Sequence, residues 1–190
     1  MNKNCLFISI DGLSDPLGQS QIIPYLKIIS QKNNKVFVFS MEKENNLKNK
    51  KKKILNSFIS QNINWKYSNY ILGLGKFGNF ISYLKLFFLC FHLVIFKNIN
   101  VIHGRGHIPS LFGLLTKILF KNKLIFDCRG FWVDERVDNK ALNLSNYFDR
   151  IIYKVNKYFE FKIFKYSDKI VCLTNKAKIK IIEIIKDKKE

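Results

Sequence analysis

The residues that could do chemistry gather in one stretch, F-D-C-R-G-F-W-V-D-E-R-V-D, from Phe126 to Asp138. It follows an apolar run typical of a strand, and Asp127 is the first acid after Glu44. An acid at a strand end in a lysine-rich half of a chain is biased toward its ionised form and toward pairing with cations. Asp127 could act there as a base or as a hydrogen-bond acceptor. A loop of salt bridges without any ligand explains the same residues equally well.

The neighbours of Asp127 add binding chemistry to this stretch. Arg129 offers a cation, Gly130 permits a tight turn, and Phe131 and Trp132 offer an apolar surface on which a sugar could stack. Three further acids are expected to be more exposed and to shape the loop: Asp134, Glu135 and Asp138. Cys128 has no neighbouring histidine in sequence to make it a nucleophile, so we predict that it packs in the core.

A second candidate stretch, D-G-L-S-D-P-L-G-Q-S-Q, begins at Asp11, directly after the first apolar run. Its glycines allow a ligand to approach the backbone at a helix N-terminus, which favours anions, and Asp11 could accept hydrogen bonds from sugar hydroxyls. The candidate ligand contacts are Asp11, Gly12, Gly18 and Gln19. An ordinary strand-to-helix loop is the competing interpretation.

The third stretch, V-I-H-G-R-G-H, places His103, Arg105 and His107 after the fourth apolar run. A single histidine is usually a satisfied polar residue, but ligands bind at the carboxyl ends of the strands in open α/β sheets. Three stretches that converge on that edge therefore favour a binding site. No cysteine or histidine pair has the spacing of zinc ligands, so no metal is predicted.

The elements that must position these residues alternate between short β-branched runs and longer helical patterns, which predicts an α/β domain with a parallel sheet. The expected strands are Cys5–Ile10, Val36–Phe39, Asn64–Tyr67, Val101–His103, Lys123–Asp127 and Lys169–Leu173. The first expected helix begins after Ser20, which is its predicted N-cap. The later helices are expected at Leu47–Ile63, Phe77–Lys97, Pro109–Phe120, Leu144–Tyr166 and in the tail from Lys176.

Two helical segments leave alternatives open. The helix Phe77–Lys97 is apolar nearly all round, which fits either deep packing or partial burial in a membrane surface, with packing favoured. The run Lys50–Lys53 could bind phospholipid head groups or could be a solvated basic helix start. The glycines of a literal G-x-G-x-x-G, at 73, 75 and 78, follow the third strand without a suitable acid, so we reject dinucleotide binding there.

Composition sets the outer limits. With 190 residues, 47% hydrophobic residues and 15% aromatic residues, the chain should fold as one domain. The net charge of +19 favours an anionic partner, such as phosphate groups or an acidic membrane surface. Nucleic acid is disfavoured, because arginine forks and patterned aromatics are missing from any recognisable motif. Four scattered cysteines and no visible signal peptide predict a cytoplasmic protein.

Together the three stretches resemble the N-terminal half of group 1 glycosyltransferases, which form the large retaining family 4. The resemblance covers essentially the whole chain and implies the N-terminal, Rossmann-like half of a GT-B fold. In that family the N-terminal half binds the acceptor and the C-terminal half binds a nucleotide-sugar donor. The resemblance also implies that Gly18 lies near the donor diphosphate. Asp127 stands where many relatives carry a histidine, although an acid is usual in the Asp-x-Arg-Gly subgroup, so no role of that histidine is carried over.

The resemblance also predicts what the chain needs. The Glu-x7-Glu donor motif of the family does not occur. We therefore expect a single acceptor-binding domain over residues 1–190, without the nucleotide-sugar-binding domain and bound to no cofactor of its own. It is expected to be inactive alone, as either a truncated enzyme or one that a separate donor domain completes. The expected acceptor is a glycan or a lipid-linked glycan in cell-envelope polysaccharide or glycolipid synthesis, at the inner face of the plasma membrane. The alternative is a non-catalytic binding module for an anionic lipid or glycan.

Overall fold

Strands and helices alternate along the chain in the computed structural model, which describes residues 4–31, 34–71 and 75–187. In chain order the elements are β1 (Asn4–Ser9), η1 (Gly18–Ile22, a π-helical turn), α1 (Ile23–Ser30), β2 (Lys35–Glu42), α2 (Glu44–Phe58), β3 (Ile63–Asn69), α3 (Gly75–Phe96), β4 (Val101–Arg105), α4 (His107–Phe120), β5 (Lys123–Cys128), α5 (Trp132–Asp138), α6 (Tyr147–Tyr166), β6 (Lys169–Cys172) and α7 (Asn175–Asp187).

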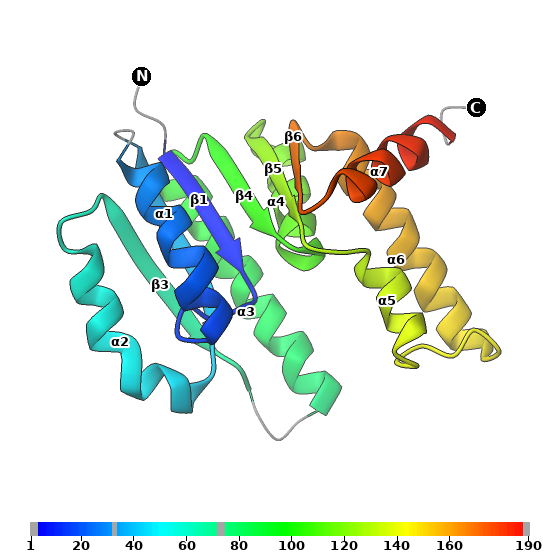
Figure 1. Cartoon of the computed structure of the whole chain (residues 1–190), viewed down its shortest axis with the longest axis horizontal. Coiled ribbons are helices and arrows are strands. Elements are labelled where there is room, and N and C mark those ends of the chain that lie inside the picture. The colour runs from blue at the N-terminus through cyan, green and yellow to red at the C-terminus, as the bar shows by residue number, and fades with distance from the viewer. Residues whose placement is uncertain (1–3, 32–33, 72–74, 188–190) are drawn as a thin grey trace.

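The six strands form one sheet in the order β3-β2-β1-β4-β5-β6, and every neighbouring pair is parallel (Figure 1). The prediction of an α/β domain with a parallel sheet is confirmed. The direction of chain progression reverses between β1 and β4, which makes this pair the switch point where ligands of such sheets bind. β3 lies at the outer edge of the sheet, and Gly75 and Gly78 belong to the first part of α3, the helix that follows it. Gly73 lies outside the described residues.

Helices cover the two faces of the sheet unequally. α1 and α2 bury one face of β1 and β2, through residues such as Phe7, Leu26 and Ile54. α3, α4, α6 and α7 bury the other face along β2, β1, β4 and β5 in a larger core. On the α1 side, the surface over β6 stays open: Val171 and Leu173 are 45% and 59% exposed. The part of this sheet face that lies over β6 therefore remains uncovered in the described chain.

Several predicted boundaries are wrong. Ser20 is no N-cap, because the helical path already starts near Pro16 and the Ser20 hydroxyl donates back to the Pro16 carbonyl at 2.9 Å. The second helix begins at Glu44 rather than Leu47 and ends at Phe58, so the run Lys50–Lys53 lies in its middle. The acids after Trp132 lie on a short helix, α5, where a loop was expected.

α3 packs on one side and is exposed on the other. Leu86, Cys90 and Leu93 are buried in the larger core, whereas Phe88 and Phe96 are each 65% exposed. None of the helices within the described ranges has both the length and the apolar character needed to cross a membrane. The packed interpretation of this helix is therefore correct for half of its surface, and the other half is an unusually apolar surface.

Candidate functional site at the carboxyl edge of the sheet

The strand register brings the three predicted stretches to one place. Ser9 at the end of β1 pairs with Arg105 of β4, and Arg105 pairs with Asp127 of β5. Alternation along a strand then decides the face on which each side chain lies. His103, Arg105 and Asp127 lie on the α1 side, whereas Gly104 and Phe126 face the helices of the larger core. The polar residues thus gather on one side of the switch point.

Arg105 is the centre of this cluster. Its side chain is 6% exposed, and its guanidinium lies 3.4 Å from Asp11 and 3.3 Å from Asp127. Both distances exceed the length of about 2.7 to 2.9 Å that is normal for a charge-assisted hydrogen bond. The two carboxylates are therefore held near the arginine without being saturated by it, and they keep lone pairs for a further donor, such as a sugar hydroxyl.

Gln21 links Arg105 to Arg129, although the sequence analysis named Gln19 rather than Gln21. Its side-chain oxygen accepts a hydrogen bond from Arg105 at 2.8 Å and from Arg129 at 2.6 Å. Arg129 also approaches Asp127 at 3.5 Å. Two cations thus share one amide oxygen and one carboxylate. Gln19 and Gln21 both lie in the π-helical turn, whose residues point in other directions than those of a regular α-helix. The sequence alone therefore does not show which of the two glutamines faces the sheet edge.

His103 lies beneath the cluster, with its ring centroid 4.9 Å from that of Phe7 at a tilt of 48° and its Nδ1 3.3 Å from the Tyr25 hydroxyl. Its Nε2 is buried and finds no hydrogen-bond partner among the described residues. The pKa of His103 is lowered to about 4, chiefly by burial; Asp127 opposes this shift and Arg105 adds to it. The ring is therefore neutral near pH 7 and can act as a donor or acceptor, but it is no cation at this edge.

The loop between β1 and the first helix is held by a residue that the sequence did not single out. The carboxylate of Glu42, at the end of β2, is fully buried and accepts hydrogen bonds from the backbone nitrogens of Leu13 (2.7 Å) and Ser14 (3.1 Å). Gln19 closes the other side of the loop by donating to the Leu13 carbonyl at 2.6 Å. Glu42 was missed because the second strand was predicted to end at Phe39.

Close packing explains the two glycines of this loop. A Cβ on Gly12 would lie 2.7 Å from Glu42 Oε2, and a Cβ on Gly18 would lie 2.1 Å from the Gly12 carbonyl oxygen. Both positions therefore require glycine for the loop to pack, whether or not a ligand binds. Gly12, Gly18 and Gln19 surround the loop, whereas Asp11 alone reaches the arginine cluster.

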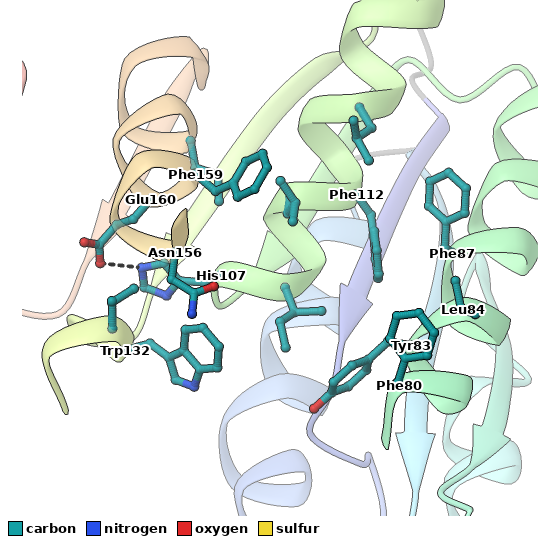
Figure 2. Close-up of a pocket in the computed structure, with 15 residues that line it drawn as sticks. Phe80, Tyr83, Leu84, Phe87, His107, Phe112, Trp132, Asn156, Phe159 and Glu160 are labelled. Carbon is teal, nitrogen blue, oxygen red and sulfur yellow. Dashed lines mark hydrogen bonds and ion pairs between the residues drawn. The ribbon is translucent and has the colours of Figure 1, made fainter. Parts of the chain in front are cut away.

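His107 and Trp132 lie on the opposite side of the sheet edge from His103. His107 Nε2 is 3.0 Å from Glu160 on α6, and the His107 ring stacks on Trp132 with centroids 6.1 Å apart (Figure 2). Glu160 also pairs with Lys157, which reaches Asp134 on α5 at 3.2 Å. The three polar residues of the third stretch therefore do not share one cavity, because Arg105 adjoins both His103 on the α1 side and His107 at the sheet edge. Asp134 ties α5 to α6.

Three adjoining cavities lie side by side along this edge of the sheet. The polar cavity, of about 330 Å³, lies on the α1 side and is lined by Gln21, Tyr25, His103, Arg105, Asp127 and Arg129 among others. The edge cleft, of about 160 Å³, shares Arg105 and Arg129 with it and adds Asp11 and Gly130. The apolar groove, of about 590 Å³, lies between α3, α4, α5 and α6 and shares His107, Ile108 and Trp132 with the edge cleft.

The side chains of this site can bind a ligand and stabilise charge. Burial raises the pKa of the Cys128 thiol to about 12, and its Sγ faces the Gly130 carbonyl at 3.4 Å, so it is a core thiol rather than a nucleophile. The described residues contain no group of three metal-ligating side chains. What remains is a set of two carboxylates, two guanidinium groups and one amide, which suits a polyhydroxylated ligand near an anionic group.

Comparison with known proteins supports the class of fold. The sequence matches no protein-family model and no curated protein. The structure is similar to HepE from Anabaena in complex with UDP, with a TM-score of 0.55 and 9% identity, over 95% of this chain and 40% of HepE. HepE in complex with UDP and glucose gives the same score over 96% of this chain and 41% of that one. MurG from Acinetobacter baumannii matches 68% of this chain and 37% of its own length, at 15% identity and a TM-score of 0.46.

The fold is that of a Rossmann-like GT-B glycosyltransferase domain. The chain spans about two fifths of the length of HepE, so the likeness concerns one domain of that protein. At this level of identity the likeness concerns the fold. It does not extend to the individual side chains of the polar cavity.

Proposed function

We propose that this chain is the acceptor-binding domain of a retaining, nucleotide-sugar-dependent glycosyltransferase related to family 4. The observation that carries the proposal is the convergence of Asp11, Arg105, Asp127 and Arg129 at the switch point of a glycosyltransferase-like sheet. Hydroxyl-rich ligands need paired acceptors and donors that are fixed in advance, and this cluster supplies both. By analogy with HepE, which has been crystallised with UDP and glucose, the donor is a uridine diphosphate sugar.

In this proposal the cluster positions the acceptor and stabilises charge. Asp127 orients both arginines and accepts a hydrogen bond from an acceptor hydroxyl, and Arg129, which is 30% exposed, faces the departing diphosphate. The proton of the acceptor hydroxyl passes to the departing phosphate oxygen, as in the retaining family that the sequence resembles. Asp127 is thus a positioning and charge-stabilising group in this proposal, because each of its carboxylate oxygens faces an arginine.

A donor-binding half completes the enzyme in this proposal, on the same polypeptide or on a separate one. The uncovered sheet face over β6 supports it, because Val171 and Leu173 are apolar and exposed beside the polar cavity. A domain that packed there would bring its nucleotide next to Arg129. The charge of +19 and the exposed aromatic residues of α3 and α6 support a place at an anionic membrane surface, in polysaccharide or glycolipid synthesis.

A transfer assay tests the proposal. The chain is combined with the donor-binding half and a labelled UDP-sugar, and labelled glycan or glycolipid is measured. We expect Asp127→Ala to lower transfer at least about 100-fold, because charge stabilisation of this kind is worth that much. Asp138→Ala is the matched control: it removes an exposed acid of the same stretch on α5 and should leave transfer unchanged.

Arg129→Ala is a second variant that should fold like wild type, because Arg129 is partly exposed. It should also lower transfer, which would show that the loss is not caused by unfolding. Transfer that survives both substitutions overturns the assignment of the site. A non-catalytic module for an anionic lipid or glycan is the second candidate, favoured by the fact that Asp11 and Asp127 are both paired with arginine. It predicts ligand binding without transfer under any pairing with a donor half.

A further inference from the structure

The apolar groove has the shape of a site for an elongated apolar ligand. Figure 2 shows Phe80, Leu84 and Phe87 of α3 facing Phe159 of α6 across α4. Its volume of about 590 Å³ is in the range of small-molecule sites, which is about 300 to 1,000 Å³. Its walls stay partly open to solvent, since Leu84 and Leu115 are each 40% exposed. Such concave apolar surface is costly to leave in water.

Polarity changes along one continuous path. His107, Ile108 and Trp132 line both the groove and the edge cleft, which in turn shares Arg105 and Arg129 with the polar cavity. The charged residues of the groove are confined to its end beside α5, where Glu160 is paired with His107 and Lys157. The α3 side of the groove is aromatic and aliphatic. A ligand that follows this path must be polar at one end and apolar at the other.

We infer that the groove binds the hydrocarbon chain of an amphiphilic acceptor whose hydroxyl-bearing head occupies the edge cleft and the polar cavity. The inference rests on the proposed function, because it assigns the head to the acceptor cluster. Trp132 stands between the two parts, stacked on His107 and held by Arg136, whose guanidinium lies 4.9 Å from the indole ring. Its flat face suits the junction of a sugar ring and an alkyl chain.

A homologous series of soluble amphiphiles tests the inference without any donor sugar. Methyl, hexyl, heptyl, octyl and nonyl glucosides are titrated into the full chain below their micelle concentrations, and Kd is measured by calorimetry. Each buried methylene should strengthen binding about fourfold, until the chain fills the groove. Methyl glucoside reports the head alone.

Two variants on α4 separate the groove from the general surface. Leu115→Glu puts a charge into the groove and should weaken octyl glucoside binding at least about tenfold. Ile118→Glu is the matched control, because Ile118 is 69% exposed on the same helix and does not line the groove, so its Kd should change less than about twofold. Both residues are exposed enough for the variants to fold, which circular dichroism verifies.

A Kd that is independent of chain length overturns the inference, and so does equal weakening by the two variants. Binding only to vesicles of phosphatidylglycerol and phosphatidylethanolamine, with no response to monomeric glucosides, likewise overturns it in favour of a surface contact. Failure of the proposed function is a separate result: the chain-length dependence would hold while no labelled sugar is transferred. The groove would then belong to a lipid-binding module.

Discussion

The polar cavity and the apolar groove open on the same edge of the sheet, yet they are built in opposite ways. The polar cavity rests on buried groups that constrain one another: Arg105 between two carboxylates, His103 beneath it, and Glu42 behind the neighbouring loop. The groove is formed by half-exposed side chains of α3, α4 and α6 that few polar contacts hold in place. Changes to the buried groups that support the polar cavity should therefore disturb the fold, whereas changes to the half-exposed side chains of the groove should disturb mainly what binds there.

The division follows from the pleat of β4 and β5. His103, Arg105 and Asp127 alternate with Gly104 and Phe126, so one face of the strands is charged and the other is apolar. Gly104 is required on the apolar face, because a Cβ there would lie 2.7 Å from the Ser110 backbone nitrogen of α4. The same strand ends thus border two chemically different cavities, an arrangement that suits a ligand with one polar end and one apolar end.

The largest expected effect comes from the support of the polar side. Glu42→Ala should lower the free energy of unfolding by about 4 kcal/mol, since two backbone N–H groups and two hydroxyls lose a buried acceptor. Urea unfolding measures it. Glu44→Gln removes an exposed acid at the start of α2 and should leave the unfolding midpoint nearly unchanged. If Glu42→Ala costs less than about 1 kcal/mol, the loop is not held in this way.

The buried imidazole should make stability depend on pH. The pKa of His103 is lowered to about 4 in the folded chain, whereas an unfolded histidine titrates near 6.5, so the unfolded state binds the proton first. The stability that neutral His103 contributes is present above pH 6.5 and is lost as pH falls toward 4. Wild type should lose about 3 kcal/mol more than His103→Gln between pH 7 and pH 4.

Urea unfolding at the two pH values measures that difference, and His92→Gln controls for the loss of an exposed imidazole on α3. Equal losses for wild type and His103→Gln would show that the ring is hydrated, and the polar cavity would then extend deeper than described.

The link between the two arginines should matter for binding more than for folding. Gln21→Ala removes the oxygen that accepts from Arg105 and Arg129, so both guanidinium groups become mobile. Binding of methyl glucoside should weaken about tenfold, the worth of one hydrogen bond to a charged group. Calorimetry measures it, and Ser20→Ala, in the same helical turn, should bind like wild type. Unchanged affinity for Gln21→Ala would separate the arginines from the sugar.

The smallest effect on stability is expected in the groove. Leu114 is buried in the larger core and Leu115, its neighbour on α4, is 40% exposed. Leu114→Ala should cost about 3 kcal/mol and Leu115→Ala less than about 1 kcal/mol. Thermal and urea unfolding of the two variants compare them directly. A large cost at Leu115 would mean that the groove wall is part of the core after all.

The sequence predicted the parts of this picture that depend on local pattern. Alternating apolar runs and helices gave the parallel sheet, and the rule for strand ends placed Asp11, Arg105 and Asp127 together. It could not assign Glu42, Gln21 or Glu160, because each has a partner that is distant in sequence: Ser14, Arg105 and His107, respectively. The groove was also beyond reach, since it exists only where α3, α4, α5 and α6 come together.

Separate recognition of head and chain is tested most directly by measuring Kd for methyl and octyl glucoside with wild type, Arg129→Ala and Leu115→Glu. We expect Arg129→Ala to weaken both ligands by the same factor, because it acts on the head. Leu115→Glu should weaken octyl glucoside alone, because it acts on the chain. Equal weakening of both ligands by Leu115→Glu, or no effect of Arg129→Ala on either, would contradict it.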